Sequence, residues 1–241
     1  MDRLGVSLAH CESKCTNFYD AHEVERVFYP ELEQLMLDYF PGSTDALVYN
    51  HDVFDKDYDG DVVEDQDNKD PGVNTGYSDV VHNDLNDNSG RVRCRELLTQ
   101  NLRNFGRELR YTEAEADAKM SSRFMSINLA KPMETVRQNP FVLCAWPSFS
   151  GQPYINNYRV YDDRVGETTQ FTYRPEHEWY WVPNQTPNEV SMLKCYDSVT
   201  DGSVSRWSFH SSSIDHTAPE DAPCRKNLVA VSYTHLTLPT N

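Results

Sequence analysis

The sequence has no run of about 18 apolar residues, which is the length that a membrane-spanning helix requires. The opening stretch MDRLGVSLAHCESKC contains no long apolar core, so it has no feature of a secretory signal. Cysteine is also sparse, with six in 241 residues, which is too few for a disulfide scaffold of this size. We therefore expect reduced thiols in a cytoplasmic protein that does not contact membranes.

Positive charge is scarce as well. Lys and Arg number 22 against 38 Asp and Glu, so the formal net charge is −16, which disfavours nucleic acid and anionic membrane surfaces as partners. Much of the acid lies in an insert at about 52–79, whose stretch DKDYDGDVVEDQ copies the D-x-D-x-D-G opening of an EF-hand with Asp55, Asp57 and Asp59. Gln66 stands where a bidentate Glu belongs, and no helices flank the stretch. We expect a solvated acidic loop, with calcium binding as an alternative.

The pattern of apolar residues predicts helices at the front of the chain and strands behind them. Helical periodicity covers 20–40 and 89–109, and a capping box formed by Thr112 and Glu115 opens a further helix. From Phe124 onward, short β-prone runs alternate with Pro, Gly, Asn and Asp. These runs are RFMSINLA, FVLCAW, TQFTYR, EWYWVP, SMLKCYDS, SRWSFH and NLVAV. Such spacing indicates an α+β chain with a jelly-roll-like β-core.

The stretch VVHNDLND (80–87) places a histidine two residues before an aspartate. In an extended chain, residues i and i+2 share a face, so His82 and Asp84 would point the same way. Two histidines and one carboxylate form the facial triad that holds Fe(II) with open positions. A polar turn at a strand end is the ordinary alternative for an isolated H-x-D.

A facial triad needs a second histidine farther along the chain. The candidates are His177, His210, His216 and His235. His210 ends the strand-like run SRWSFH, and beyond it Arg225 opens the run RKNLVAV. The planar guanidinium of an arginine matches the carboxylate of a dicarboxylate cosubstrate. Taken alone, His210 is better explained as an ordinary strand-end histidine and Arg225 as a surface charge, and the ordered set brings an iron site level with these alternatives.

Five blocks of sequence carry a resemblance to a known family. In order they are NFYDAHEVERVFYPELEQLM with ALVYNHDVF, VHNDLNDNSG, RFMSINLAKPM, HEWYWVPNQTPNEVSMLKCYDS and FHSSSIDHTAPEDAPCRKNLVAV. Through them the chain resembles the fungal and bacterial hydroxylase/desaturase family that includes AsaB, CmcJ and the gibberellin desaturases. That family is assigned to the Fe(II)- and 2-oxoglutarate-dependent oxygenases, which have a double-stranded β-helix (jelly-roll or cupin-like) core. The resemblance implies this core here, with N-terminal and flanking helices.

The resemblance also implies roles for individual residues. It makes His82, Asp84 and His210 the iron ligands, and it removes His216, which stands where the family tends to have proline. Arg225 falls on the arginine of an Arg-x-Ser motif and would hold the distal carboxylate of 2-oxoglutarate. Further residues expected to line the cofactor pocket are Asn128, Tyr180 and Lys131, the last at a family arginine position. The tryptophans at 146, 179 and 181 are candidates for pocket walls.

The chain departs from the family at several points. Asn227 replaces the motif serine, which removes a hydroxyl that would help to hold a carboxylate. The last residues, SYTHLTLPTN (232–241), resemble translated adapter sequence, so we expect a non-native tail that adds no strand. We expect residues 1–231 to form a single oxygenase-like domain that begins partway through the family's opening block.

The implied activity is oxidative decarboxylation of 2-oxoglutarate to succinate and CO₂, coupled to the hydroxylation or desaturation of a small secondary-metabolite-like substrate. The implied partners are that substrate and O₂. Two alternatives from other classes stay open. In the first, the chain is a jelly-roll binding module without catalytic activity. In the second, it is an acidic calcium-binding protein that uses residues 55–66. Neither alternative accounts for the order His82, Asp84, His210 and Arg225.

Overall fold

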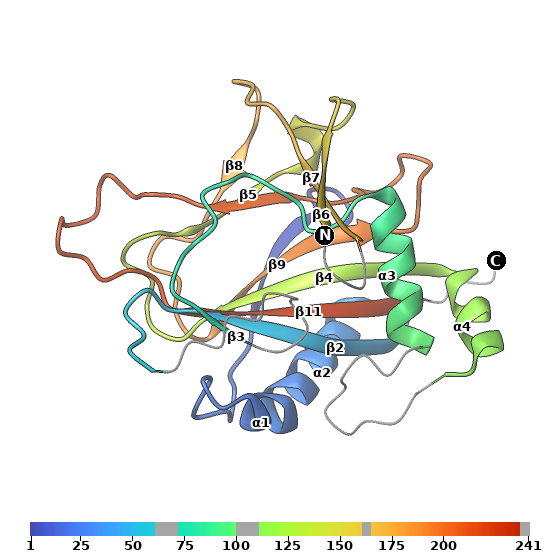
Figure 1. Cartoon of the computed structure of the whole chain (residues 1–241), viewed down its shortest axis with the longest axis horizontal. Helices are drawn as coiled ribbons and strands as arrows, with labels where there is room; N and C mark the ends of the chain where they lie inside the picture. The colour runs from blue at the N-terminus through green and yellow to red at the C-terminus, as the bar shows by residue number, and fades with distance from the viewer. Residues whose placement is uncertain (61–71, 100–110, 161–164, 237–241) are drawn as a thin grey trace.

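A six-stranded sheet forms the centre of the computed structural model, which describes residues 1–60, 72–99, 111–160 and 165–236. Its strands run in the order β1-β9-β4-β11-β2-β3 (Figure 1), and all neighbours are antiparallel except β2 and β3. The strands are β1 (Val6–His10), β2 (Ser43–Phe54), β3 (Gly72–Asn74), β4 (Arg123–Pro132), β9 (Glu189–Asp197) and β11 (Asn227–Leu236).

A smaller sheet lies across from the first one. It has the order β10-β5-β8, from β10 (Phe209–Ser212), β5 (Phe141–Cys144) and β8 (Trp179–Tyr180). A separate hairpin consists of β6 (Ile155–Val160) and β7 (Val165–Gln170). Figure 1 shows β5 above the large sheet, with the hairpin rising beside it. The expected α+β fold with a jelly-roll core is confirmed.

The two faces of the large sheet have different neighbours. Leu228 and Ala230 of β11 are fully buried in a core that includes Leu32 and Met36 of the N-terminal helices. Val229 and Val231 alternate with them and line a cavity on the opposite face. This period-two alternation is what a strand imposes on its side chains. One face of the sheet is therefore a packed core, while the other is the floor of a cavity.

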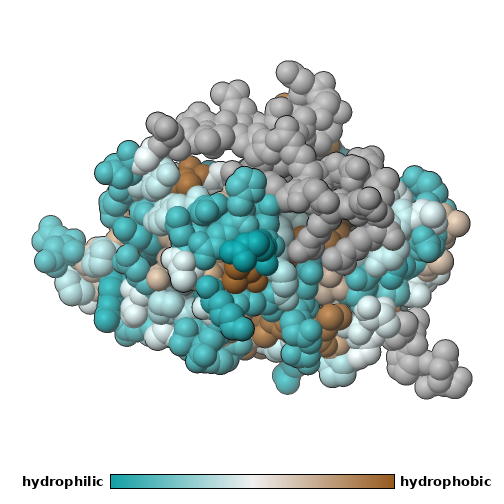
Figure 2. All heavy atoms as spheres, turned by 90° about the horizontal axis from the view of Figure 1, so that it is seen from below, coloured by the Kyte–Doolittle hydropathy of each residue, from teal (hydrophilic) through white to brown (hydrophobic). Residues whose placement is uncertain are grey.

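The predicted 20–40 helix is present as three consecutive pieces. They are α1 (Ala21–Glu23), the π-helical turn η1 (Val24–Phe28) and α2 (Tyr29–Tyr39). Asp20 caps the first piece, because its side chain accepts hydrogen bonds from the backbone N–H groups of His22 and Glu23. Pro30 lies in the first turn of α2, directly after the π-helical turn. Seen from below in Figure 2, the described surface is mostly hydrophilic with scattered hydrophobic areas.

Two further helices flank the sheets. They are α3 (Asp87–Thr99) and α4 (Glu113–Met120). The capping box of Thr112 and Glu115 is confirmed, and Leu98 is buried as its helical position predicts. The remaining apolar positions expected on the 89–109 helix, from 102 onward, lie outside the described residues. None of the described helices combines the length and apolar character needed to cross a lipid bilayer.

The expectation that the last residues add no strand is wrong for Ser232 to Leu236. They continue β11 and pair with β2 on one side and β4 on the other. The Ser232 hydroxyl donates to the Ile127 carbonyl at 2.8 Å, and Tyr233 packs fully buried in a core cluster. Extended polar and aromatic residues complete a central strand because both neighbours supply backbone partners. The origin of this segment and the division into one domain over 1–231 stay predictions.

The acidic insert differs from the solvated loop that we expected. Residues 52–54 belong to β2, and Asp55 is buried, accepts a hydrogen bond from the Tyr19 hydroxyl at 2.5 Å and lies 3.6 Å from Lys226 Nζ. A buried carboxylate needs such partners, so Asp55 has a structural position. Residues 61–71, which include Gln66, lie outside the described part. In the part of the insert that is described, no three metal-binding side chains meet.

Gly90 gives a test of how α3 is fixed to the sheet. A Cβ at this position would collide with the ring of Tyr196, which is on β9. We expect Gly90→Ala to lower the free energy of unfolding by about 1–2 kcal/mol, because overpacking outweighs the helix-propensity gain of about 1 kcal/mol. Urea denaturation measures this change. Arg91→Ala, at an exposed position of the same helix, should stay within about 0.5 kcal/mol of the parent. A Gly90→Ala protein as stable as the parent would contradict the close packing.

Candidate active site

The His-x-Asp segment is fixed by backbone pairing with the small sheet. His82 N–H donates to the His210 carbonyl at 3.1 Å, and His210 N–H donates back to His82 at 2.9 Å. Asn83 points away, is fully buried, and its amide donates to the carbonyls of Leu85 and Cys195. Because side chains alternate along an extended chain, His82 and Asp84 then share a face, as the sequence predicts.

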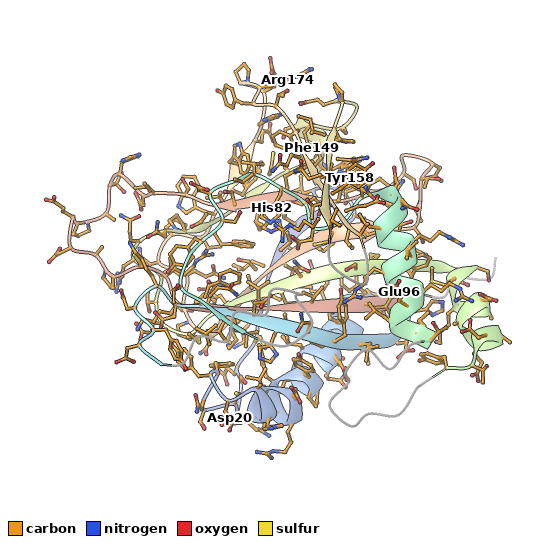
Figure 3. The ribbon with its side chains drawn as sticks, in the orientation of Figure 1. Asp20, His82, Glu96, Phe149, Tyr158 and Arg174 are labelled. Atoms are coloured by element: carbon orange, nitrogen blue, oxygen red, sulfur yellow. The ribbon has the colours of Figure 1, made fainter. Side chains whose placement is uncertain are left out.

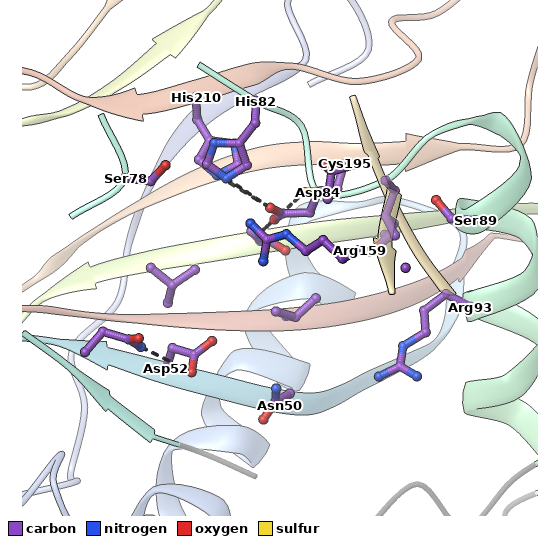
Figure 4. A pocket seen from close by; sticks show the side chains of 18 of the residues that line it. Asn50, Asp52, Ser78, His82, Asp84, Ser89, Arg93, Arg159, Cys195 and His210 are labelled. Atoms are coloured by element: carbon purple, nitrogen blue, oxygen red, sulfur yellow. Dashed lines mark hydrogen bonds and ion pairs between the residues drawn. The ribbon is translucent and has the colours of Figure 1, made fainter. Parts of the chain in front are cut away.

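The structure brings the three predicted ligands together. One donor atom from each of His82, Asp84 and His210 lies within 4.8 Å of the others. His82 Nε2 is 3.3 Å and His210 Nε2 is 3.9 Å from Asp84 Oδ1. At these separations the three side chains could hold one metal ion between them. Figure 4 shows both imidazoles directed at the Asp84 carboxylate.

Hydrogen bonds orient two of these ligands. His82 Nδ1 lies 2.7 Å from the Val80 carbonyl, which can only accept, so Nδ1 carries a proton and Nε2 is the nitrogen that faces Asp84. The other carboxylate oxygen, Asp84 Oδ2, accepts from the Asn128 amide at 2.5 Å and from the Cys195 thiol at 3.8 Å. Oδ1 is left to face the imidazoles. Such outer contacts fix the geometry of a metal ligand.

The protonation states suit metal binding. Burial lowers the pKa of His210 to about 3, and the charge of His82 acts in the same direction, so His210 is neutral at pH 7. Burial alone would raise the pKa of Asp84, but the two imidazoles and the Asn128 amide hold it well below its usual range. Burial also works to lower the pKa of His82, and the contact with Asp84 overcomes it and raises that pKa. The ionised carboxylate of Asp84 and the neutral imidazole of His210 can therefore bind a metal without a change in their protonation.

A bulge in β9 places Cys195 beside the carboxylate. Ser126 pairs with Tyr196 while the next residue, Ile127, pairs with Lys194, so Cys195 is the extra residue. Burial raises the pKa of this thiol, which therefore stays protonated and can donate to Asp84. Nothing in the sequence around Cys195 indicated this role, because it depends on the pairing register of two distant strands.

A cavity of about 560 Å³ contains the three ligands and, on its floor, Arg225. The Arg225 side chain is 5% exposed, and its guanidinium carbon lies 5.1 Å from the ring centroid of Tyr77 and 5.2 Å from that of Phe141. Its Nε and Nη1 atoms have no hydrogen-bond partner among the described residues. Burial lowers the pKa of Arg225 to about 10, so it stays charged at pH 7. A buried cation with free donors requires an anion.

Phe141 links the two parts of the cavity. Its ring centroid is 5.4 Å from that of His210, and on its other side it packs against the Arg225 guanidinium. Asn227, the first residue of β11 and two residues after Arg225, is buried with both side-chain polar atoms unpaired among the described residues. The asparagine that replaces the family serine therefore supplies an amide donor at the same place.

Two predicted pocket residues lie elsewhere. Tyr180 is 46% exposed on β8, and its hydroxyl donates to Glu178 at 3.3 Å, away from the cavity lining. Lys131 points to the helix-covered face of β4, where its ammonium donates to the carbonyls of Cys11 and Pro187. Asn128 does line the cavity, and a residue three positions farther along a strand faces the other way. The prediction that Tyr180 and Lys131 bind the cofactor is therefore wrong.

The tryptophans are not cavity walls either. Trp146 and Trp179 pack against a separate aromatic cluster around Phe149, and Trp181 is half exposed. The other candidate histidines are remote from the three ligands as well. His177 is near Gln152, and His235 Nδ1 is 2.9 Å from the Thr44 hydroxyl.

Sequence reasoning did not identify four residues of this site. They are Tyr77, Phe141, Arg159 and Cys195. Their proximity to the ligands arises from strand pairing and loop placement, for which no local pattern exists. Arg225 was found because it precedes a strand-like run, which the structure begins two residues later at Asn227, and because of the family resemblance.

Comparisons with known proteins find a matching family and several relatives. A family model described as "Oxidoreductase/YMDC permease-like domain" matches residues 1–229. The hydroxylase/desaturase efuI of Hormonema carpetanum is 29% identical over 105 residues, covering 37% of this chain and 34% of that protein. The chain thus spans about a third of the length of this relative.

Two further matches are more extensive. The alpha-ketoglutarate-dependent dioxygenase phiK of Fungal sp. is 24% identical over 226 residues, which cover 93% of this chain and 75% of that protein. A solved structure of the iron and alpha-ketoglutarate-dependent endoperoxidase NvfI superposes with a TM-score of 0.76 at 16% identity, covering 98% of this chain and 78% of that one. At this identity the superposition establishes the fold.

Removal of any one ligand should abolish tight metal binding. His82→Ala, Asp84→Ala and His210→Ala should each weaken Fe(II) binding by more than about 100-fold, which exceeds the loss typical of outer-contact mutations. Anaerobic Fe(II) titration measures the affinity. His216→Ala, at an exposed histidine outside the cluster, is the matched control and should bind normally. If His216→Ala lost the metal, the choice of His210 would be wrong.

Asn128 should matter through the carboxylate that it holds. Asn128→Ala removes the donor to Asp84 Oδ2, so that carboxylate can rotate, and we expect about a 10- to 100-fold loss of Fe(II) affinity. The same titration on Ser126→Ala should show no loss, because the buried Ser126 hydroxyl lies on the same strand and has no hydrogen-bond partner among the described residues. Equal affinities of the two variants would mean that Asn128 does not position the ligand.

Proposed function

The chain belongs to the family described as "Oxidoreductase/YMDC permease-like domain", and we propose that it is a non-haem Fe(II)- and 2-oxoglutarate-dependent oxygenase. Its reaction would be the hydroxylation or desaturation of a small secondary-metabolite-like substrate. The observation that carries this proposal is one cavity with two features: the cluster of His82, Asp84 and His210, and the buried Arg225 whose donors lack partners among the described residues. The relatives named as hydroxylase/desaturase and as alpha-ketoglutarate-dependent dioxygenase support it.

The donor set fits Fe(II). Two imidazoles and one carboxylate on the same side of a metal leave its remaining positions open, which is the arrangement used by non-haem iron oxygenases. A bound Fe(II) with 2-oxoglutarate and O₂ supplies the oxidising chemistry that removes hydrogen from a substrate. The chain's own contribution is to orient Asp84 through Asn128 and to fix the His82 tautomer through the Val80 carbonyl.

Arg225 fits the cosubstrate. An uncompensated buried charge is costly, and a carboxylate that accepts two parallel hydrogen bonds from a guanidinium offsets that cost. Tyr77 and Phe141 lie on the guanidinium and restrict the direction of its free N–H groups. 2-Oxoglutarate has two carboxylates and a keto group. The keto group and the carboxylate beside it can bind a metal while the distal carboxylate binds Arg225, so a single molecule would satisfy both parts of the cavity.

The rival functions have less support. A binding module without catalytic activity would have no need for the bonds that orient Asp84 and His82. A calcium protein would use Asp55, but this carboxylate already accepts from Tyr19 and lies beside Lys226. We place the protein in the cytoplasm, where its six free cysteines, five of them buried, would stay reduced. Its partners would be O₂ and the small-molecule substrate.

A turnover assay tests the proposal. The protein is loaded anaerobically with Fe(II) and then exposed to O₂ and 2-oxoglutarate, and succinate is measured. We expect succinate to form with the parent protein and to fall to background with Asp84→Ala. Stoichiometric Fe(II) binding without any succinate, with or without candidate substrates, would favour the non-catalytic module.

Arg225 should determine cosubstrate affinity and leave metal affinity intact. Deleting one partner of a buried charged pair costs about 2–5 kcal/mol. At about 1.4 kcal/mol per decade, Arg225→Ala should raise the 2-oxoglutarate Kd about 30- to several-thousand-fold. Arg225→Lys should recover only part of this, since an ammonium cannot form two parallel bonds.

The measurement is a 2-oxoglutarate titration of the Fe(II)-loaded protein. Arg174→Ala serves as the matched control, because Arg174 is exposed and lies at the top of the molecule away from His82 (Figure 3). Unchanged affinity in Arg225→Ala would mean that the cosubstrate is held elsewhere or that the protein does not use it.

A further inference from the structure

A second arginine reaches into the cavity from the side that faces solvent. Arg159 lies on β6, in the hairpin with β7, and its side chain is exposed while it lines the cavity wall. Figure 4 shows this side chain extending over the cavity toward Asp84. Its position therefore differs from that of Arg225, which is buried on the floor between two aromatic rings.

The other charged groups on this side of the cavity already have partners. Arg93 Nη1 lies 3.5 Å from Glu96 Oε2, and Glu167 accepts hydrogen bonds from the amides of Asn86 at 2.6 Å and Asn88 at 2.9 Å. Among the residues that the structure describes, none forms a hydrogen bond or an ion pair with the Arg159 guanidinium. A cation in a cavity without a protein partner is available to a ligand.

The hairpin is held in a fixed place relative to the metal ligands. Glu167 ties β7 to the start of α3, where the Ser89 hydroxyl also donates to the Glu167 carbonyl at 2.9 Å. Thr169 of β7 exchanges backbone hydrogen bonds with Asn83, the residue between His82 and Asp84. Directly across the hairpin from Arg159 is Gly166, which has no side chain to fill the space beside the guanidinium stem.

Apolar side chains flank the same entrance. Val92 of α3 is 49% exposed and Val165 of β7 is 56% exposed, and both line the cavity. A cavity of about 560 Å³ is within the range of about 300–1,000 Å³ that holds a small molecule. Apolar groups at its entrance favour a ligand with an apolar body, because such a ligand removes their surface from water.

We infer that Arg159 recognises a carboxylate on the substrate, whose apolar body packs against Val92 and Val165. This inference rests on the proposed function, which assigns Arg225 to the cosubstrate. With Fe(II) and 2-oxoglutarate bound, the charges of the metal, Asp84, the cosubstrate and Arg225 cancel. Among the described residues that line the cavity, Arg159 is then a cation without an ion-pair partner that a further anion can use. A singly charged carboxylate fits better than a phosphate, whose second charge the neighbouring carboxylates would repel.

A matched pair of probes tests the inference on the Fe(II)- and 2-oxoglutarate-loaded protein without O₂. Anthracene-9-carboxylate carries the proposed charge, and anthracene-9-methanol has the same apolar body without it. We expect the parent protein to prefer the carboxylate by about tenfold, a typical value for a charge-assisted hydrogen bond with partial exposure to water. Arg159→Gln should remove this preference while leaving the affinity for the alcohol unchanged, and Arg159→Lys should retain part of it.

The controls separate this inference from the proposed function. Arg174→Gln removes an exposed arginine outside the cavity and should keep the full preference. The 2-oxoglutarate Kd is measured on the same variants, and Arg159→Gln should leave it unchanged. The probe titration is repeated on the metal-free protein. There the preference for the carboxylate probe should still depend on Arg159, even if the protein shows no Fe(II)-dependent turnover. No preference in the parent, or a preference that survives Arg159→Gln, would overturn the inference, as would a 2-oxoglutarate Kd that rises in Arg159→Gln.

Discussion

Two backbone hydrogen bonds between His82 and His210 bring together residues that are far apart in the chain. They join the His-x-Asp segment to the outer edge of the small sheet, so both imidazoles point at the same space. The same extended conformation turns Asn83 inward, where its amide is anchored to the Cys195 carbonyl on β9 of the large sheet. The group of His82, Asp84 and His210 is thus held by both sheets of the fold, and it lines the cavity.

The charged groups of the cavity lie in separate regions, each of which would bind a different partner. The Asp84 carboxylate is shared, with one oxygen facing the imidazoles and the other held by Asn128 and Cys195. Arg225 is buried without a described partner for two of its nitrogens, and it is separated from His210 only by the Phe141 ring. A dicarboxylate chelated at the metal would resolve the cost of that charge. The solvent-facing hairpin is left to contact the substrate.

The helices, caps and strands that depend on a few neighbouring residues were predictable from the sequence. Helix 20–40, the Thr112 capping box and the strand runs follow from periodicity and from side-chain hydrogen bonding within a few residues. The pairing of His82 with Asp84 follows from the two-residue repeat of a strand. The same repeat, applied to β4, would have shown that Lys131 cannot share a face with Asn128.

Other features depend on contacts that no local pattern encodes. Cys195 reaches Asp84 because of a register shift between two strands, and Tyr77 reaches Arg225 from a loop far away in the chain. The buried position of Asp55 likewise depends on Tyr19 and Lys226, which a count of acidic residues does not reveal. The sequence from Ser232 onward resembles adapter sequence, but Ser232 to Leu236 still continue β11, because a central strand accepts an extended backbone that has partners on both sides.

The proposed function requires one ligand that reaches both Arg225 and the group of His82, Asp84 and His210. Visible absorption spectroscopy of the Fe(II)-loaded protein under strictly anaerobic conditions tests it most directly, because chelation of Fe(II) by the keto acid produces a charge-transfer band. The account predicts that such a band appears when 2-oxoglutarate is added and saturates at one equivalent. It also predicts that pyruvate, which has the keto acid group without the distal carboxylate, gives the band only at much higher concentration. Equal concentration dependence for the two acids, or no band with either, would contradict the account.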